Sequence, residues 1–142
     1  MSMGPRRRGR VLAVQALYAW DLSRDAAELP DFPWIEEAEA AAWDDQVRAF
    51  ARLLLAGTLE NIDAVDGEIR KKLENWDFGR ISRVDLAVLR MSVYCLLFLE
   101  EIPASVVIDE AVEIARDFGT DDSYRFVNGV LDGIRKNISK DG

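Results

Sequence analysis

The densest positive charge in this chain lies close to its amino end. Four arginines open the stretch RRRGRVLAVQALYAW, residues 6–20: Arg6, Arg7, Arg8 and Arg10. Guanidinium groups bind phosphates, so the cluster is a candidate anchor for a nucleic-acid backbone. Local helix stability does not explain it, because a cation near a helix start typically costs about 0.3–1 kcal/mol. The alternative is a solvated terminal tail with no binding role.

Aromatic residues accompany basic ones at two places. Tyr18 follows the arginines by two helical turns, within an uncharged segment. Further along, Arg125 stands between Tyr124 and Phe126. Proteins that bind single-stranded RNA stack such rings on unpaired bases. For Tyr18 the alternative is a core aromatic residue whose hydroxyl reaches the surface.

The chain as a whole is acidic, with 26 Asp and Glu against 18 Lys and Arg and a net charge of −8. This balance argues against indiscriminate binding of nucleic acid, but it leaves room for a local basic site. Acidic residues are dense between Asp21 and Asp45. The simplest interpretation of that segment is a solvated face that repels non-specific nucleic acid.

The sequence lacks the usual residues of an enzyme active site. It contains no histidine, which removes histidine-dependent triads and most catalytic zinc sites. It also contains no CxxC, Walker or GxGxxG motif. We therefore expect a protein that is not an enzyme, with no catalytic residues, metal or cofactor. A hydrolase that uses carboxylates alone ranks last among the alternatives.

Nothing in the sequence predicts export or membrane insertion. The apolar runs are shorter than the roughly 20 residues needed to span a bilayer. Gln15 and Asp21 interrupt the apolar segment that a signal peptide would need. The single cysteine, Cys95, can form no intrachain disulfide, which fits a reducing compartment. We expect a cytoplasmic protein.

The apolar periodicity predicts helices almost throughout, in one domain or two small subdomains. In the first helix, Val11, Val14, Tyr18 and Leu22 share one apolar face. Residues 24–33 read as a connection and 34–41 as a short acidic helix. A longer helix is expected from about residue 43 past residue 69, with a bend near Gly57.

Local signals also predict where the later helices begin and end. Ser82 can cap a helix, and Asp85 completes a capping box. Pro103 suits the first turn of the next helix. Phe118-Gly119 is typical of a left-handed helix stop, and Thr120 can cap a last helix whose first turn carries two acids, Asp121 and Asp122.

A glycine inside that last helix predicts a helix contact. Phe126, Val130 and Ile134 form its apolar face, and Asn128 and Gly129 lie between them in sequence. Glycine costs roughly 1 kcal/mol against alanine in a helix interior. We therefore expect another helix to approach Gly129 closely, with Asn128 hydrogen-bonded across the contact.

Three blocks of the chain together resemble the NusB family of bacterial transcription antitermination factors. They are RRRGRVLAVQALYAWDL near the start, ISRVDLAVLRMSVYCLLF in the middle, and IPASVVIDEAVEIARDFGTDDSYRFVNGVLDGI near the end. The first and last blocks are the specific ones. Residues 24–75 match only in helical character. Gly9 departs from the pattern, and we expect it to weaken the helix and let the arginines move.

The resemblance implies an all-α helical bundle of two three-helix subdomains, about residues 6–75 and 76–138. It implies an RNA-binding factor that recognises the single-stranded boxA element of ribosomal RNA transcripts together with NusE, a small-subunit ribosomal protein. The pair would help assemble an antitermination complex on RNA polymerase. Family members occur as monomers and as homodimers, and the sequence does not decide between these states.

The resemblance also assigns roles to individual residues. It implies that the arginine cluster and Tyr18 contact RNA, and that Tyr18 and Asp85 contact NusE. It adds Asp122, Arg125 and Phe126 as the carboxy-terminal part of the RNA site. Two other functions stay open at this point, namely the RNA-binding domain of a ribosomal RNA methyltransferase and a helical adaptor that binds proteins only.

Overall fold

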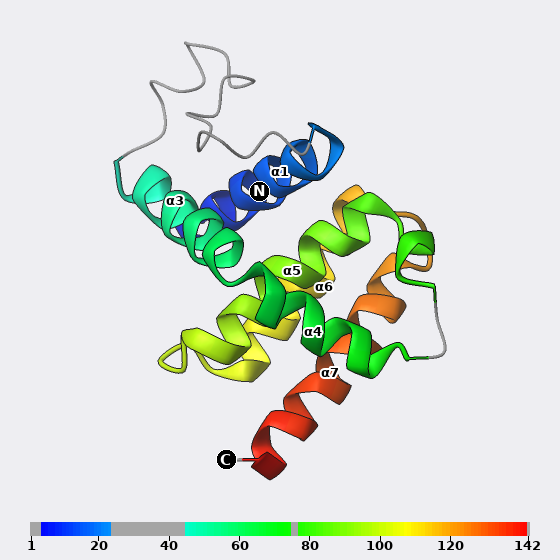
Figure 1. The fold of residues 1–142 in the computed structure, drawn as a ribbon. Helices are drawn as coiled ribbons and strands as arrows, with labels where there is room; N and C mark the ends of the chain where they lie inside the picture. The colour runs from blue at the N-terminus through cyan, green and yellow to red at the C-terminus, as the bar shows by residue number, and fades with distance from the viewer. Residues whose placement is uncertain (1–3, 24–44, 75–76, 142) are drawn as a thin grey trace.

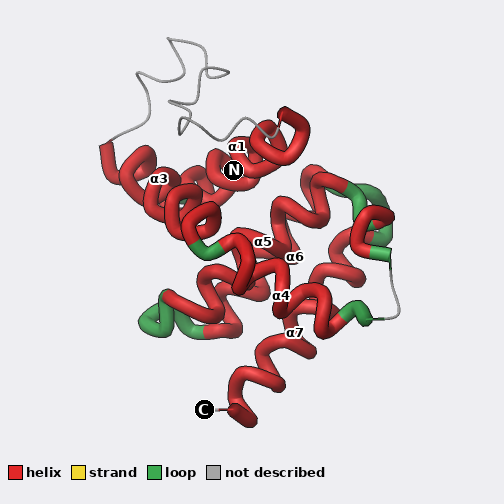
Figure 2. The backbone as a smooth tube through the Cα atoms, viewed as in Figure 1, coloured by secondary structure: helices red, strands yellow, loops and turns green. Residues whose placement is uncertain are grey.

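The computed structural model describes residues 4–23, 45–74 and 77–141. Every regular element among them is helical, which confirms the all-α prediction (Figures 1 and 2). The expected short helix over 34–41 and the connection before it lie outside the described residues. The elements are α1 (Pro5–Ser23), α3 (Asp45–Glu60), α4 (Ile62–Lys72), the 3₁₀ turn η1 (Phe78–Arg80), α5 (Arg83–Phe98), α6 (Ala104–Phe118) and α7 (Ser123–Asp141).

Helix α5 forms the centre of the bundle, and α1, α3, α4, α6 and α7 all pack against it (Figure 1). Its residues from Asp85 to Cys95 are all buried, including the charged side chains of Asp85 and Arg90. Helices α1 and α3 form one pair and α6 and α7 another. Helix α4 packs mainly on α5 and α7, and the subdomain boundary near residue 75 stays a prediction. No helix of the described residues is long and apolar enough to cross a membrane.

Helix α1 continues through Gly9, so our expectation of a weakened, movable amino end is wrong. A Cβ at Gly9 would lie 2.8 Å from Cδ2 of Phe50 and 3.3 Å from the carbonyl oxygen of Val47. Gly9 is therefore the point at which α1 approaches α3 most closely. The missing side chain stabilises the contact between the helices, and the contact holds the arginine-bearing turns in place.

The expected long middle helix is divided in two, and the break lies at Asn61 rather than at Gly57. The Asn61 side chain donates from Nδ2 to the carbonyl oxygen of Gly57, at 2.8 Å. Gly57 itself stays helical, and its bare backbone faces the ring of Tyr94, which a Cβ would overlap. The glycine signal here was a packing signal and not a bend.

The structure confirms the cap of α5 but not the expected stop after α6. The hydroxyl of Ser82 accepts from the backbone N–H of Asp85 at 3.1 Å. In return, Oδ1 of Asp85 finds no hydrogen-bond partner among the described residues, so the capping box is only half formed. Gly119 has φ −95° and ψ −165°, which is extended and not left-handed. Its bare backbone leaves room for the side chain of Ser123 instead.

The beginning of α7 also differs from the expectation. The helix begins at Ser123 and not directly after Thr120, and the Thr120 N–H donates to the Ser123 hydroxyl at 2.9 Å. Asp121 and Asp122 therefore precede the first turn. The helix contact expected at Gly129 is wrong: Asn128 and Gly129 are exposed, and no described atom of another helix lies within 4 Å of a Cβ placed at Gly129.

Candidate nucleic-acid interface

Two of the four arginines lie against one buried aromatic ring. The guanidinium carbon of Arg6 is 4.3 Å from the centroid of the Phe50 ring, and that of Arg10 is 5.3 Å from it. Phe50, on α3, is 7% exposed. Each such contact is worth about 0.5–1 kcal/mol or more. Phe50 therefore holds the amino-terminal turns of α1 in a fixed position relative to α3.

The four arginines differ strongly in exposure although all lie within α1. Arg6 is exposed, Arg7 and Arg8 are half-buried, and Arg10 is 5% exposed. Burial away from water lowers the pKa of Arg10, while nearby Glu110 opposes that shift. The cluster is thus part of a folded helix and not a disordered tail. Its contact with RNA stays a prediction.

Arg7 is held by a carboxylate from α6. Its Nε donates to Oε2 of Glu110 at 2.7 Å, and its Nη2 donates to Oε1 at 3.2 Å. The hydrogen bond to Glu110 raises the pKa of Arg7, and Glu113 and Asp117 add to that effect through their charges. This ion pair joins α1 to α6, and the sequence did not predict it.

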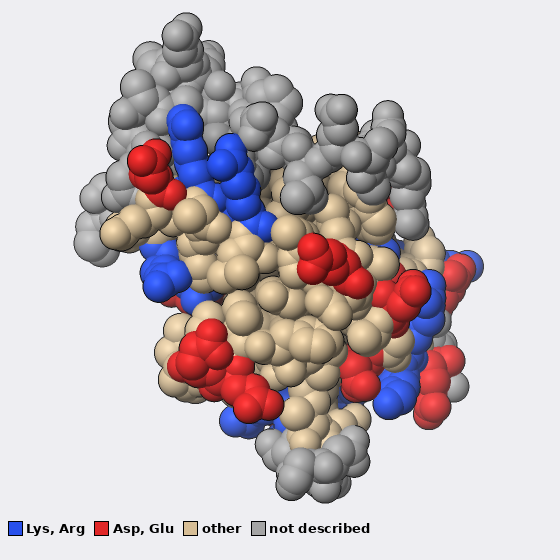
Figure 3. All heavy atoms as spheres, turned by 60° about the vertical axis from the view of Figure 1, so that its left-hand side comes forward, with Lys and Arg blue, Asp and Glu red and all other residues tan. Residues whose placement is uncertain are grey.

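A groove of about 600 Å³ runs beside the arginine cluster. Arg6, Arg10 and Glu110 border it, and its walls include two exposed aliphatic residues, Leu53 and Val106. Figure 3 turns this side of the molecule forward and shows basic side chains at the edge of a broad uncharged area bordered by acidic ones. Phosphates could lie on the cations while bases face the apolar wall.

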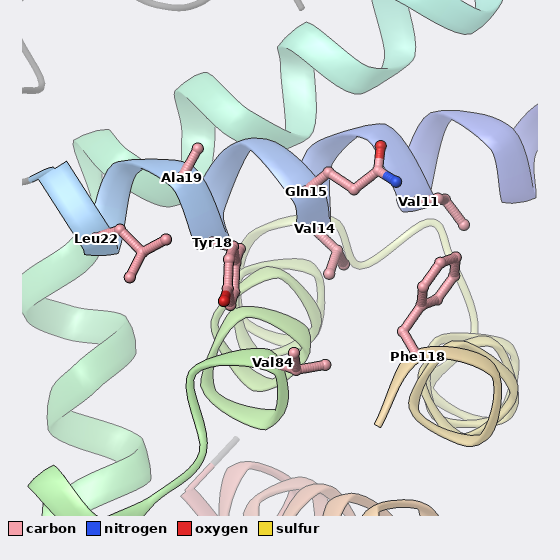
Figure 4. A pocket seen from close by; sticks show the side chains of 8 residues that line it. All are labelled: Val11, Val14, Gln15, Tyr18, Ala19, Leu22, Val84 and Phe118. Carbon is pink, nitrogen blue, oxygen red and sulfur yellow. The ribbon is translucent and has the colours of Figure 1, made fainter. Parts of the chain in front are cut away.

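A second groove, of about 440 Å³, lies between α1, α5 and α6 (Figure 4). In Figure 4, Val14 and Tyr18 point from α1 toward Val84 of α5, and Val11 lies beside Phe118 of α6. Only half of the expected apolar face of α1 therefore belongs to the core. Val11 and Val14 are buried, but Tyr18 and Leu22 are 37% and 55% exposed. An open apolar groove of this kind suits a protein partner.

The predicted RNA site also includes residues near the start of α7. Asp122 and Arg125 are exposed, and Phe126 is half-buried with its ring against the core. The guanidinium carbon of Arg116 lies 4.7 Å from the centroid of the Tyr124 ring. The Tyr124 hydroxyl accepts a hydrogen bond from Nε of Arg125 at 2.9 Å. Tyr124 is thus engaged within the protein.

Helix α6 contributes residues to both grooves. Glu110, which holds Arg7, and Phe118, in the second groove, are eight residues apart, or about 12 Å along a helix. Helix α7 begins a few residues after Phe118. That Asp122, Arg125 and Phe126 share one site with the arginines stays a prediction. Asp85 is 8% exposed and offers little open surface.

Two residues of this interface escaped the sequence reasoning. Phe50 showed only the spacing of a core residue, and its ring is indeed buried. Glu110 is one of 26 acidic residues, and no local pattern distinguishes it from the others. Their roles depend on where α3 and α6 lie relative to α1, which a single sequence does not state. Among the described residues there is also no group of acidic or cysteine side chains that could hold a metal.

Comparison with known proteins gives one consistent result. The profile of the NusB family matches residues 7–136. The transcription antitermination protein NusB of Treponema pallidum (strain Nichols) is 54% identical over 132 residues, which is 92% of each chain. The solved structure of T. maritima NusB has a TM-score of 0.80 and 41% identity, covering 95% of this chain and 93% of that one. A crystal structure of NusB and NusE with double-stranded RNA has a TM-score of 0.80 and 26% identity, covering 96% and 99%.

Proposed function

The chain belongs to the NusB family, and we propose that it acts as a transcription antitermination factor that binds RNA together with NusE. The observation that carries the proposal is the family match along 92% of the chain, with the arginine-bearing helix inside the matched region. The RNA we expect is the single-stranded boxA element of ribosomal RNA transcripts. The complex would then join the antitermination machinery on RNA polymerase in the cytoplasm.

In this proposal the arginine cluster grips the RNA backbone. Arg6 and Arg8 have accessible side chains, and Phe50 fixes the helix that carries them. Each phosphate that a cation neutralises releases counterions, so affinity for RNA falls as salt rises. The overall charge of −8 limits binding elsewhere on the surface. Asp122, Arg125 and Phe126, at the start of α7, would contact another part of the strand.

The groove that carries Tyr18 is the surface we assign to NusE. Its lining is mainly apolar, and Tyr18, Leu22 and Phe118 leave large apolar side chains in contact with solvent. Burial of such side chains on association is the usual source of affinity between proteins. This assignment supports a role in binding and assembly.

Titration of labelled boxA-type RNA, with and without NusE, tests the function directly. A scrambled RNA of the same length and composition is the control. We expect tighter binding to the boxA-type RNA, and a further gain when NusE is present. Equal binding of both RNAs, with NusE capture that survives ribonuclease, would instead support a protein-only adaptor.

A further inference from the structure

The pair between Arg7 and Glu110 has the geometry of an arginine bound to an anion. Two parallel hydrogen bonds join them, from Nε to Oε2 at 2.7 Å and from Nη2 to Oε1 at 3.2 Å. Arginine binds phosphate through the same edge of the guanidinium group, with two oxygens in the same fork. The carboxylate of Glu110 therefore stands where a phosphate would bind to Arg7.

We propose that Glu110 is an internal competitor of the RNA backbone, which must displace its carboxylate to reach Arg7. The proposal rests on the proposed function and adds a control of specificity within the same site. RNA that contacts only Arg7 replaces one anion on the guanidinium group by another and gains little binding free energy. RNA that also reaches Arg6 and Arg8 gains new contacts and can displace Glu110.

The exposure of the two partners makes this exchange feasible. The Arg7 side chain is 33% exposed and that of Glu110 is 23% exposed, so water and a ligand can reach both. Partly exposed ion pairs contribute little to stability, and a phosphate offers more acceptor oxygens than a carboxylate does. The buried pair formed by Arg90 and Asp66 contrasts with this, because Arg90 is 2% exposed and closed to any ligand.

Neighbouring acids supply a matched control. Glu113 lies one turn after Glu110 on α6 and acts on Arg7 through its charge. Its own side chain accepts from Nη1 of Arg116 at 2.9 Å and does not hold Arg7. The Glu113→Gln variant therefore removes one negative charge from the same helix and leaves the contact between Arg7 and Glu110 intact. A difference between Glu110→Gln and Glu113→Gln reports on displacement rather than on general charge.

The experiment measures binding of boxA-type and scrambled single-stranded RNA from about 50 to 300 mM salt. We expect Glu110→Gln to bind scrambled RNA on the order of fivefold more tightly than Glu113→Gln does, with a smaller preference for boxA. The salt slope should steepen by about 0.7, the value of one added phosphate contact to a single strand. Adding Arg7→Ala to Glu110→Gln should remove the gain, and melting temperatures should stay near that of the parent protein.

Two results would overturn the proposal. Weaker RNA binding by Glu110→Gln, at an unchanged melting temperature, would make Glu110 a positioning residue for Arg7. Equal RNA affinity of the two glutamine variants would show that any gain in binding comes from the change in net charge alone. A titration with inorganic polyphosphate separates this inference from the proposed function. The Nε–H signal of Arg7, recorded by NMR, reports on binding of the polyphosphate to Arg7. The polyphosphate should shift that signal at lower concentration in Glu110→Gln than in the parent, whether or not the parent prefers boxA.

Discussion

Arg90 and Asp66 form a two-point ion pair in the interior of the bundle. Nε of Arg90 donates to Oδ1 of Asp66 at 2.9 Å, and Nη2 donates to Oδ2 at 3.0 Å. Nη1 of Arg90 reaches Oδ1 of Asp21 at 3.3 Å. The side chain of Arg90 is 2% exposed. One guanidinium group thus joins α5 to α4 and to the end of α1.

Removal of one partner should be costly, because the other charge stays buried. We expect Asp66→Asn to lower the free energy of unfolding by about 3–5 kcal/mol. Glu68→Gln on the same helix is the control, because it breaks an ion pair with Lys71. The Lys71 side chain is 70% exposed, so the loss of this pair should cost at most about 1 kcal/mol. Urea denaturation of both variants measures the difference. Similar midpoints would show that the pair stabilises little.

Two glycines on helices should respond to alanine in opposite directions. At Gly9 the new Cβ would lie 2.8 Å from Cδ2 of Phe50, so α1 and α3 must move apart. At Gly129 the new Cβ meets no described atom of another helix within 4 Å, so only helix propensity changes. We expect Gly129→Ala to raise stability by up to about 1 kcal/mol and Gly9→Ala to lower it. Thermal unfolding of both variants checks the signs, and stabilisation by Gly9→Ala would contradict the close contact.

The same two glycines show how far the sequence could predict the fold. The all-helical class and the cap at Ser82 followed from local pattern and apolar spacing, but the central place of α5 did not. A glycine within a helix marks either a close contact or an exposed position, and the local sequence does not tell which of the two applies. We assigned the contact to Gly129, but the structure places a close helix contact at Gly9 and leaves Gly129 exposed. Only the tertiary arrangement decides which helix face is covered.

The site shows a similar limit. The arginine cluster and Tyr18 could be proposed from residue type, because dense cations and an aromatic ring are visible in a sequence. Phe50, Glu110 and Arg90 could not, since each acts through a partner distant in sequence: Glu110 is 103 residues from Arg7. The sequence also did not show that Arg10 is buried while Arg6 is exposed.

Cys95 should be unreactive in the folded protein. It is 2% exposed, and burial raises the pKa of its thiol to about 12. The unfolded thiol ionises near pH 8.5, so the folded state holds its proton more tightly between that pH and about 12. The stability that Cys95 contributes is therefore complete below about pH 8.5 and is lost as pH rises above it. We expect thiol reagents to react at pH 8 only after urea unfolds the chain, and rapid native labelling would contradict this.

Arg6 and Arg10 should separate binding from stability. Arg6 is exposed above the Phe50 ring, so Arg6→Ala removes one cation–π contact and the phosphate contact that we propose. We expect RNA affinity to fall and the salt slope to flatten by about 0.7, while the melting temperature changes little. Arg10 is 5% exposed, and its stem fills space between α1 and α3. Arg10→Ala should therefore lower the melting temperature as well as the affinity.

Arg10→Lys distinguishes the two roles of that buried side chain. Lysine keeps the charge and most of the aliphatic stem, but it loses the planar guanidinium group that lies over Phe50. We expect Arg10→Lys to recover most of the melting temperature and only part of the RNA affinity. Full recovery of both would mean that charge alone matters at this position. An unchanged affinity in Arg10→Ala would place Arg10 in the core and leave the exposed arginines to bind RNA, because a buried guanidinium would then contribute only packing.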